Sequence, residues 1–140
     1  MTDGLRWTLL TVSNIGWLVP ALLAFQYESM FWCVVPMCMF LFSALYHMTE
    51  NKQLEILDTI SALLFFLCGP VLLMQSGALR IEWFISLIAT LVAVSLYLIA
   101  RLYRLRGETQ KQVIAHCAWH LASSGLATAI YLIYFGYIQM

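Results

Sequence analysis

The chain has 140 residues, of which 63% are hydrophobic and 10% are charged, and its formal net charge is zero. Soluble globular domains carry about 25% charged residues, so this composition excludes an ordinary soluble protein and predicts an all-α integral membrane protein. The balanced charge gives no sign of a basic surface, and we expect no nucleic-acid partner.

Five apolar segments are each long enough to cross about 30 Å of hydrocarbon, which requires roughly 20 helical residues. Short polar breaks separate them, and none of these breaks is long enough to form a soluble domain. The pattern predicts a multi-pass protein, of unspecified compartment, with residues 1–140 forming a single membrane domain built as a five-transmembrane-helix bundle. The helices are expected at about residues 7–26, 31–48, 57–75, 83–103 and 113–138.

The first segment is interpreted as a retained membrane helix. It is long for a signal-peptide core, contains Pro20 and lacks a clear small-residue cleavage site. Asn14 and Gly16 are polar or small residues within it. Packing against a neighbouring helix is the favoured role for both, because small residues let helix backbones approach closely.

The basic residues predict the orientation of the bundle. If the helices alternate in direction, six of the seven Lys and Arg residues fall on one side of the membrane. Cytoplasmic loops carry an excess of Lys and Arg, so the N-terminus is predicted to be cytoplasmic and the C-terminus outside or lumenal. The six are Arg6, Lys52, Arg101, Arg104, Arg106 and Lys111, and Arg80 lies alone on the other side.

The last segment carries two histidines near its start, His116 and His120. Residues four apart lie one helical turn apart on the same face, so both imidazoles can point at one ion. Ionisable groups are rare inside membrane helices, because polar atoms in hydrocarbon cost free energy unless they are paired or coordinated. Hydrogen bonding between helices, or a position at the water boundary, is the alternative interpretation of such a pair.

Two other segments bring unusual residues to the same depth. The second segment ends with Ser43 and His47, one turn apart, and Asp58 opens the third segment after a short turn. The second segment ends, and the third and fifth begin, on the predicted cytoplasmic side. All three side chains are therefore expected to meet His116 and His120 in one layer.

This set of residues predicts a hydrolytic metal site. Three neutral imidazoles are a natural ligand set for zinc and leave the fourth tetrahedral position open to water, so His47, His116 and His120 are the predicted Zn²⁺ ligands. Zinc lowers the pKa of a bound water toward about 7. Asp58 could accept a proton from that water, and Ser43 could hydrogen-bond to it or to a developing oxyanion.

Other candidate ligands are weaker. Cys117 projects about 100° away from His116 around the helix, which disfavours a shared ion. Glu50 and Glu55 are more typical of a solvated turn and helix start than of catalytic acids, although either could support a histidine ligand. The cysteines lie in apolar segments without metal-site spacing, and we assign no disulfide to Cys33, Cys38, Cys68 and Cys117.

The outer half of the last segment suggests packing and interfacial roles. Small residues, including Ser124 and Gly125, suit close helix contact. Tyr131, Tyr134 and Tyr137 recur at a spacing of three, which is typical of an interfacial aromatic stripe.

The ordered motifs resemble those of the alkaline ceramidase and adiponectin-receptor-like membrane hydrolases, the CREST superfamily. The resemblance rests on S-x-x-x-H at Ser43 and His47, an aspartate at Asp58 on the next helix, and H-x-x-x-H at His116 and His120 on the final helix. The step from His47 to Asp58 is most similar to that of the ceramidase branch. The resemblance implies zinc held by the three histidines, with Asp58 and Ser43 around the bound water, and hydrolysis of an amide bond in a membrane lipid such as ceramide.

The chain departs from this family in its number of helices. Family members commonly have three helices between the aspartate helix and the final histidine helix, whereas this chain has one, at residues 83–103. Losing an even number preserves the sidedness of the motifs, so the chain resembles a shortened five-helix member. A homodimer or a larger membrane complex could replace the missing walls of the lipid pocket.

Three classes of function follow. The first is a zinc-dependent hydrolase of lipid amide bonds. The second is a non-enzymatic accessory or structural subunit of a larger membrane complex that retains the metal site. The third, a receptor-like or membrane-remodelling protein, lacks an extracellular ligand-binding domain to support it.

Overall fold

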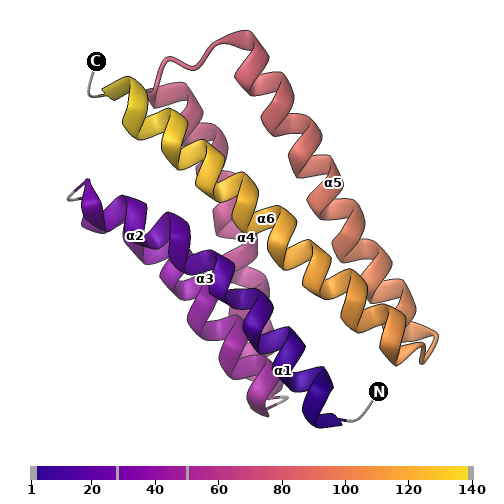
Figure 1. Ribbon diagram of the computed structural model, residues 1–140. Coiled ribbons are helices and arrows are strands. Elements are labelled where there is room, and N and C mark those ends of the chain that lie inside the picture. The colour runs from indigo at the N-terminus through magenta and orange to yellow at the C-terminus, as the bar shows by residue number, and fades with distance from the viewer. Residues whose placement is uncertain (1–2, 28, 50, 139–140) are drawn as a thin grey trace.

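The computed structural model describes residues 3–27, 29–49 and 51–138, and the described chain is helical apart from short turns. Five helices are long and apolar enough to cross a membrane, which fits a multi-pass membrane protein. Successive spans run in opposite directions (Figure 1). The elements are α1 (Asp3–Ser13), the 3-10 helix η1 (Asn14–Trp17), α2 (Leu18–Gln26), α3 (Met30–Thr49), α4 (Lys52–Gln75), α5 (Arg80–Leu105) and α6 (Thr109–Ile138).

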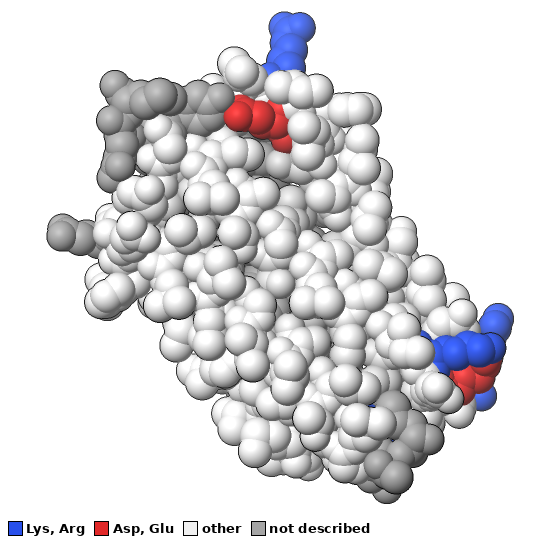
Figure 2. All heavy atoms as spheres, in the orientation of Figure 1, with Lys and Arg blue, Asp and Glu red and all other residues white. Residues whose placement is uncertain are grey.

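The surface has the polarity expected of a membrane protein. Large apolar side chains are exposed along every span, for example Leu22, Leu41, Leu63, Leu91 and Leu121. Figure 2 shows that the Lys, Arg and acidic side chains visible on one face lie at the ends of the helices, with uncharged residues between them. A hydrocarbon environment favours this arrangement, because charged groups are costly at the membrane centre.

Several helices begin earlier than the sequence predicts. The clearest case is α4, which begins at Lys52 rather than at residue 57. The Asn51 side chain accepts a hydrogen bond from the Gln53 backbone N–H at 2.8 Å. This cap satisfies a free donor and lets polar residues form the first turns. Asp58 consequently lies well inside α4 instead of opening it.

The turns between spans are short, and two of them use glycine. Gly77 and Gly107 have φ values of 69° and 71°, in the left-handed region that residues with a Cβ rarely adopt. Because the turn at Gly107 uses few residues, the two helices beside it are longer than expected: α5 extends to Leu105 and α6 begins at Thr109.

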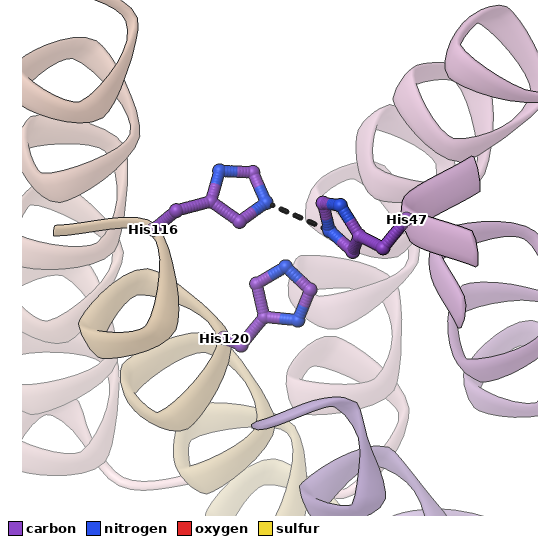
Figure 3. A group of neighbouring side chains, drawn as sticks. All are labelled: His47, His116 and His120. Atoms are coloured by element: carbon purple, nitrogen blue, oxygen red, sulfur yellow. Dashed lines mark hydrogen bonds between the residues drawn. The ribbon is translucent and has the colours of Figure 1, made fainter. Parts of the chain in front are cut away.

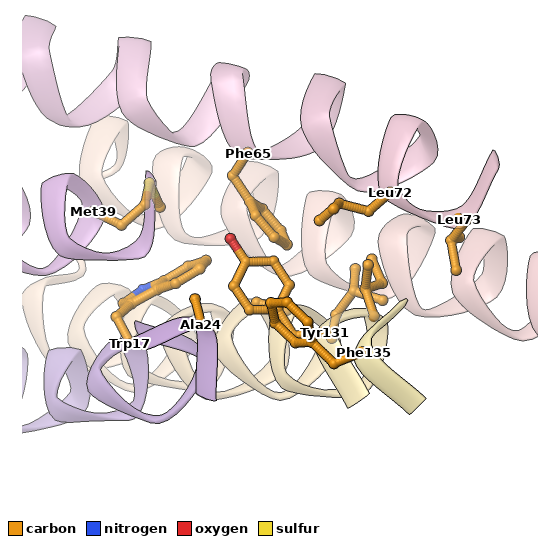
Figure 4. Close-up of a cluster of buried hydrophobic side chains, with 11 residues drawn as sticks. Trp17, Ala24, Met39, Phe65, Leu72, Leu73, Tyr131 and Phe135 are labelled. Atoms are coloured by element: carbon orange, nitrogen blue, oxygen red, sulfur yellow. The ribbon is translucent and has the colours of Figure 1, made fainter. Parts of the chain in front are cut away.

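The central element of the bundle is α6. It packs against α1, η1, α2, α4 and α5 (Figure 1). A hydrophobic core surrounds its second half (Figure 4). In this core the rings of Trp17 and Phe65 pack edge to face, with their centroids 5.1 Å apart. His116 and His120 lie in the first half of α6, so the core and the candidate site occupy different levels of the same bundle.

The first span approaches α6 closely at η1, which agrees with the expected packing role of Gly16. A Cβ added to Gly16 would lie 2.5 Å from Ser124 Oγ and 3.2 Å from Ser124 Cβ. Asn14 is fully buried at the same level, and its side-chain amide donates to the Leu10 carbonyl at 2.9 Å. Gly125, in contrast, has open space where a Cβ would lie.

The expectation of an interfacial tyrosine stripe is wrong for Tyr131. Its side chain is buried in the core, and its hydroxyl donates to the Trp32 carbonyl at 2.6 Å. Because this hydrogen bond satisfies the hydroxyl group, the polar end of the ring can be buried without leaving an unpaired polar group. Tyr134 is partly buried against the core, and the side chain of Tyr137 lies outside the described residues.

Candidate metal centre

Three histidine side chains from two helices point toward one another (Figure 3). His47 comes from the last turns of α3, and His116 and His120 come from successive turns of α6. Each imidazole offers one nitrogen to a group whose atoms all lie within 4.8 Å of one another. This histidine cluster could hold a metal ion.

One distance within the histidine cluster is close to that of tetrahedral coordination. His47 Nε2 and His116 Nε2 lie 3.2 Å apart. Nitrogen ligands bind zinc at about 2.0–2.1 Å, so two of them in a tetrahedral shell lie about 3.3–3.4 Å apart. The observed separation is close to that value, and it is equally a hydrogen-bond distance when one of the two nitrogens carries a proton.

His120 is the member of the cluster whose environment most requires a ligand. Its side chain is 0% exposed. Neither Nδ1 nor Nε2 has a hydrogen-bond partner among the described residues. A buried imidazole without partners loses the free energy of its contacts with water and gains nothing in return. A coordinated cation would compensate for that loss.

Asp58 and Ser43, the predicted catalytic residues, lie next to each other. Both are buried, and the Ser43 hydroxyl interacts with the Asp58 carboxyl group. The geometry is poor for a regular hydrogen bond, since Ser43 Oγ and Asp58 Oδ1 each lack a well-formed one. Asp58 does not belong to the group of convergent metal-binding atoms. It therefore lies outside the histidine cluster.

A cavity of about 480 Å³ connects the histidine cluster with Asp58. His47, His116 and Asp58 all line it, so a ligand in the cavity would reach both the candidate metal ligands and the carboxyl group. Pockets of this size accommodate small molecules or the reactive part of a larger one. The arrangement allows chemistry on a bound ligand at the end of the bundle where α1, α4 and α6 begin.

The same end of the bundle gathers most of the basic residues, and we call it the basic end. Arg104 joins α5 to the rest of the bundle there: its guanidinium donates to Glu55 Oε1 at 2.7 Å and to the Tyr46 hydroxyl at 3.0 Å. Outside the cavity, Lys111 donates to Glu108 Oε2 at 2.6 Å. That hydrogen bond holds the pKa of the Glu108 carboxyl below its ordinary value.

The weaker candidates that the structure describes do not belong to the histidine cluster. Cys117 directs its thiol toward the Leu9 carbonyl at 3.5 Å, away from the three imidazoles. All four cysteines are free. Glu55 pairs with Arg104 instead of supporting a histidine. Glu50 lies outside the described residues.

Sequence reasoning assigned the basic residues to membrane orientation and missed their place in the cavity. Arg6, Lys52, Arg101 and Arg104 come from three different spans, and all four line it. Their shared side of the membrane was the feature of the sequence that could have indicated a common cavity, because residues at the same end of a bundle can face one space. Which helices would enclose that space could not be predicted from spacing.

Comparisons with protein-family models, with curated proteins and with solved structures find no match to this chain.

Proposed function

We propose that this chain is a zinc-dependent membrane hydrolase that cleaves an amide bond in a lipid of the ceramide type. The observation that carries the proposal is His120, a fully buried imidazole whose two nitrogens have no hydrogen-bond partner among the described residues and which points toward two further histidines. No fourth protein ligand joins the three imidazoles within the described chain, and three imidazoles alone are typical of a catalytic zinc site rather than a structural one.

The donor set favours a transition metal such as zinc over calcium or magnesium. Imidazole suits zinc, copper, iron and nickel, whereas calcium and magnesium prefer oxygen ligands. When bound, zinc would supply a Lewis acid that makes a coordinated water a nucleophile near neutral pH. His47, His116 and His120 would hold the ion.

Asp58 and Ser43 would serve the reaction from beside the metal. Asp58 lines the same cavity as two of the histidines, and its buried carboxyl group is able to take up and release a proton there. Ser43 would orient that carboxyl group through the contact between the two side chains. A purely structural metal site would need neither residue.

The resemblance to the ceramidase branch supports the choice of lipid, and the excess of basic residues at one end supports the orientation of the chain. The basic end would face the cytoplasm, because Lys and Arg accumulate on that side of membrane proteins. The lipid would enter from the bilayer with its polar part in the cavity. A second copy, or a larger complex, would supply walls that a five-helix chain lacks.

A second candidate is an accessory subunit that binds zinc as a staple between α3 and α6. The observation that favours it is the location of the cluster, which links two helices through His47 and His116 at 3.2 Å. A purified protein with this function would retain zinc, would not hydrolyse the lipid and would copurify consistently with a partner.

The test is elemental metal analysis of the detergent-purified protein, comparing wild type with His116→Ala and Cys117→Ala. We expect about one zinc per chain in wild type and in Cys117→Ala, and none in His116→Ala, because only the histidine belongs to the cluster. Hydrolysis of ceramide in mixed micelles then separates the enzyme from the staple. Wild type free of zinc after purification in zinc-containing buffer would contradict both functions.

A further inference from the structure

The cavity beside the histidine cluster is lined by more positive than negative charge. Among the described residues, four basic side chains line it, from Arg6, Lys52, Arg101 and Arg104, and two acidic ones, from Glu55 and Asp58. A cavity with low-dielectric walls strengthens the field of the charges around it and raises the local concentration of ions of opposite sign.

The two acidic groups do not neutralise all of this charge. Glu55 is engaged by Arg104 at 2.7 Å, and Asp58 is buried next to Ser43. Lys52 and Arg101 are exposed, and within the described part of the chain neither forms an ion pair. Arg101 is oriented by the Tyr97 hydroxyl, 3.4 Å from its Nη1. Both cations are therefore available to a ligand.

The cavity is polarised between its two sides. Lys52 and Arg101 are exposed at the basic end, whereas His47 is only 3% exposed and His116 is partly buried. A ligand with an anionic group would place that group against the exposed cations. Its uncharged part would then lie toward the histidine cluster and Asp58.

We infer that Lys52 and Arg101 bind a phosphate group in this cavity, so that the substrate is a lipid amide with a phosphate-bearing headgroup. Guanidinium matches the geometry of phosphate oxygens, and lysine adds a point charge. The inference rests on the proposed function for the identity of the lipid, but the phosphate site itself depends on the basic residues alone.

The experiment compares the binding of ceramide 1-phosphate with that of ceramide by the detergent-purified protein. Lys52→Gln/Arg101→Gln removes two cavity cations, and Arg80→Gln/Arg106→Gln is the matched control, because it changes the charge equally at exposed residues that do not line the cavity. One basic residue near a charged lipid surface contributes about fivefold to binding. We expect the phosphorylated lipid to bind about 25-fold more weakly to the cavity double variant, with little change in the control.

Two further arms separate the sources of phosphate and the two proposals. Inorganic phosphate at millimolar concentration should compete weakly if a lipid headgroup is the ligand, and fully if the site takes free phosphate. Repeating the binding measurement after a chelator has removed any metal tests the contribution of the basic residues alone. If wild type bound the phosphorylated lipid in a charge-dependent way but did not hydrolyse it, only the proposed hydrolase would be contradicted. Equal binding of both lipids, unchanged in the cavity double variant, would overturn the phosphate site.

Discussion

His47 Nε2 and His116 Nε2 lie 3.2 Å apart, although 69 residues and two complete spans separate them along the chain. As a hydrogen bond, this contact joins one protonated and one unprotonated nitrogen and leaves His120 without a partner. As one edge of a tetrahedral shell, the same distance would join two ligands of one ion, and His120, which points toward the same space, would be the third (Figure 3). The second arrangement accounts for all three imidazoles, and the predictions on metal binding depend on it.

Metal removal should destabilise the protein. A ligand that binds only the folded state contributes about 2.7 kcal/mol at a concentration 100 times its Kd. We expect chelation to lower the thermal unfolding midpoint in detergent, and zinc to restore it. His120→Ala should be insensitive to both treatments, because its cluster is incomplete. A midpoint in wild type that responds to neither chelator nor zinc would contradict the site.

Acidification should release the metal. Imidazole binds a metal only when it is neutral, so protons compete for the same nitrogens. The stabilisation by metal is therefore present at neutral pH and is lost as the pH falls and protons occupy the imidazole nitrogens. Metal retained after dialysis across a pH series measures this, and readjustment to neutral pH with added zinc should restore occupancy. A metal content that does not change across the whole acidic series would contradict a site made of histidines.

Asp58→Asn should separate metal binding from turnover. The substitution keeps the size of the side chain but removes its ability to take up a proton, and loss of general acid–base catalysis costs about 10²–10⁴-fold in rate. We expect zinc content to be unchanged, since Asp58 is outside the convergent histidine group. Glu108→Gln is the control, as an acidic residue at the basic end that does not line the cavity. Unimpaired hydrolysis by Asp58→Asn would remove the assigned role.

Gly16→Ala should weaken the contact between the first span and α6. The new Cβ would meet Ser124 Oγ at 2.5 Å and Ser124 Cβ at 3.2 Å, and overpacking costs about 1–3 kcal/mol. Thermal unfolding in detergent should show a lower midpoint for Gly16→Ala but not for Gly125→Ala, where a Cβ has open space. Adding Ser124→Ala removes the closer contact and should recover part of the loss. Equal midpoints for the two glycine variants would contradict this packing.

Helical periodicity and hydrophobic length are local properties, and they were enough to predict five membrane-length helices. The spacing of His116 and His120 likewise predicts a shared face, because 3.6 residues per turn place them one above the other. Alternating spans bring His47 to the same depth. These features depend on the geometry of single helices and the order in which they cross the membrane, both of which can be inferred from one sequence.

Packing between helices determined the rest. Tyr131 is buried in the core because a carbonyl of another helix accepts its hydrogen bond, a partner that no spacing rule identifies. Lys52 and Arg101 line one cavity because α4 begins and α5 ends at the same end of the bundle, and the sequence shows only that they share a side. The rotation of each helix about its axis depends on side-chain contacts with its neighbours. Those contacts, which form only in the assembled bundle, gave the histidine cluster its basic cavity.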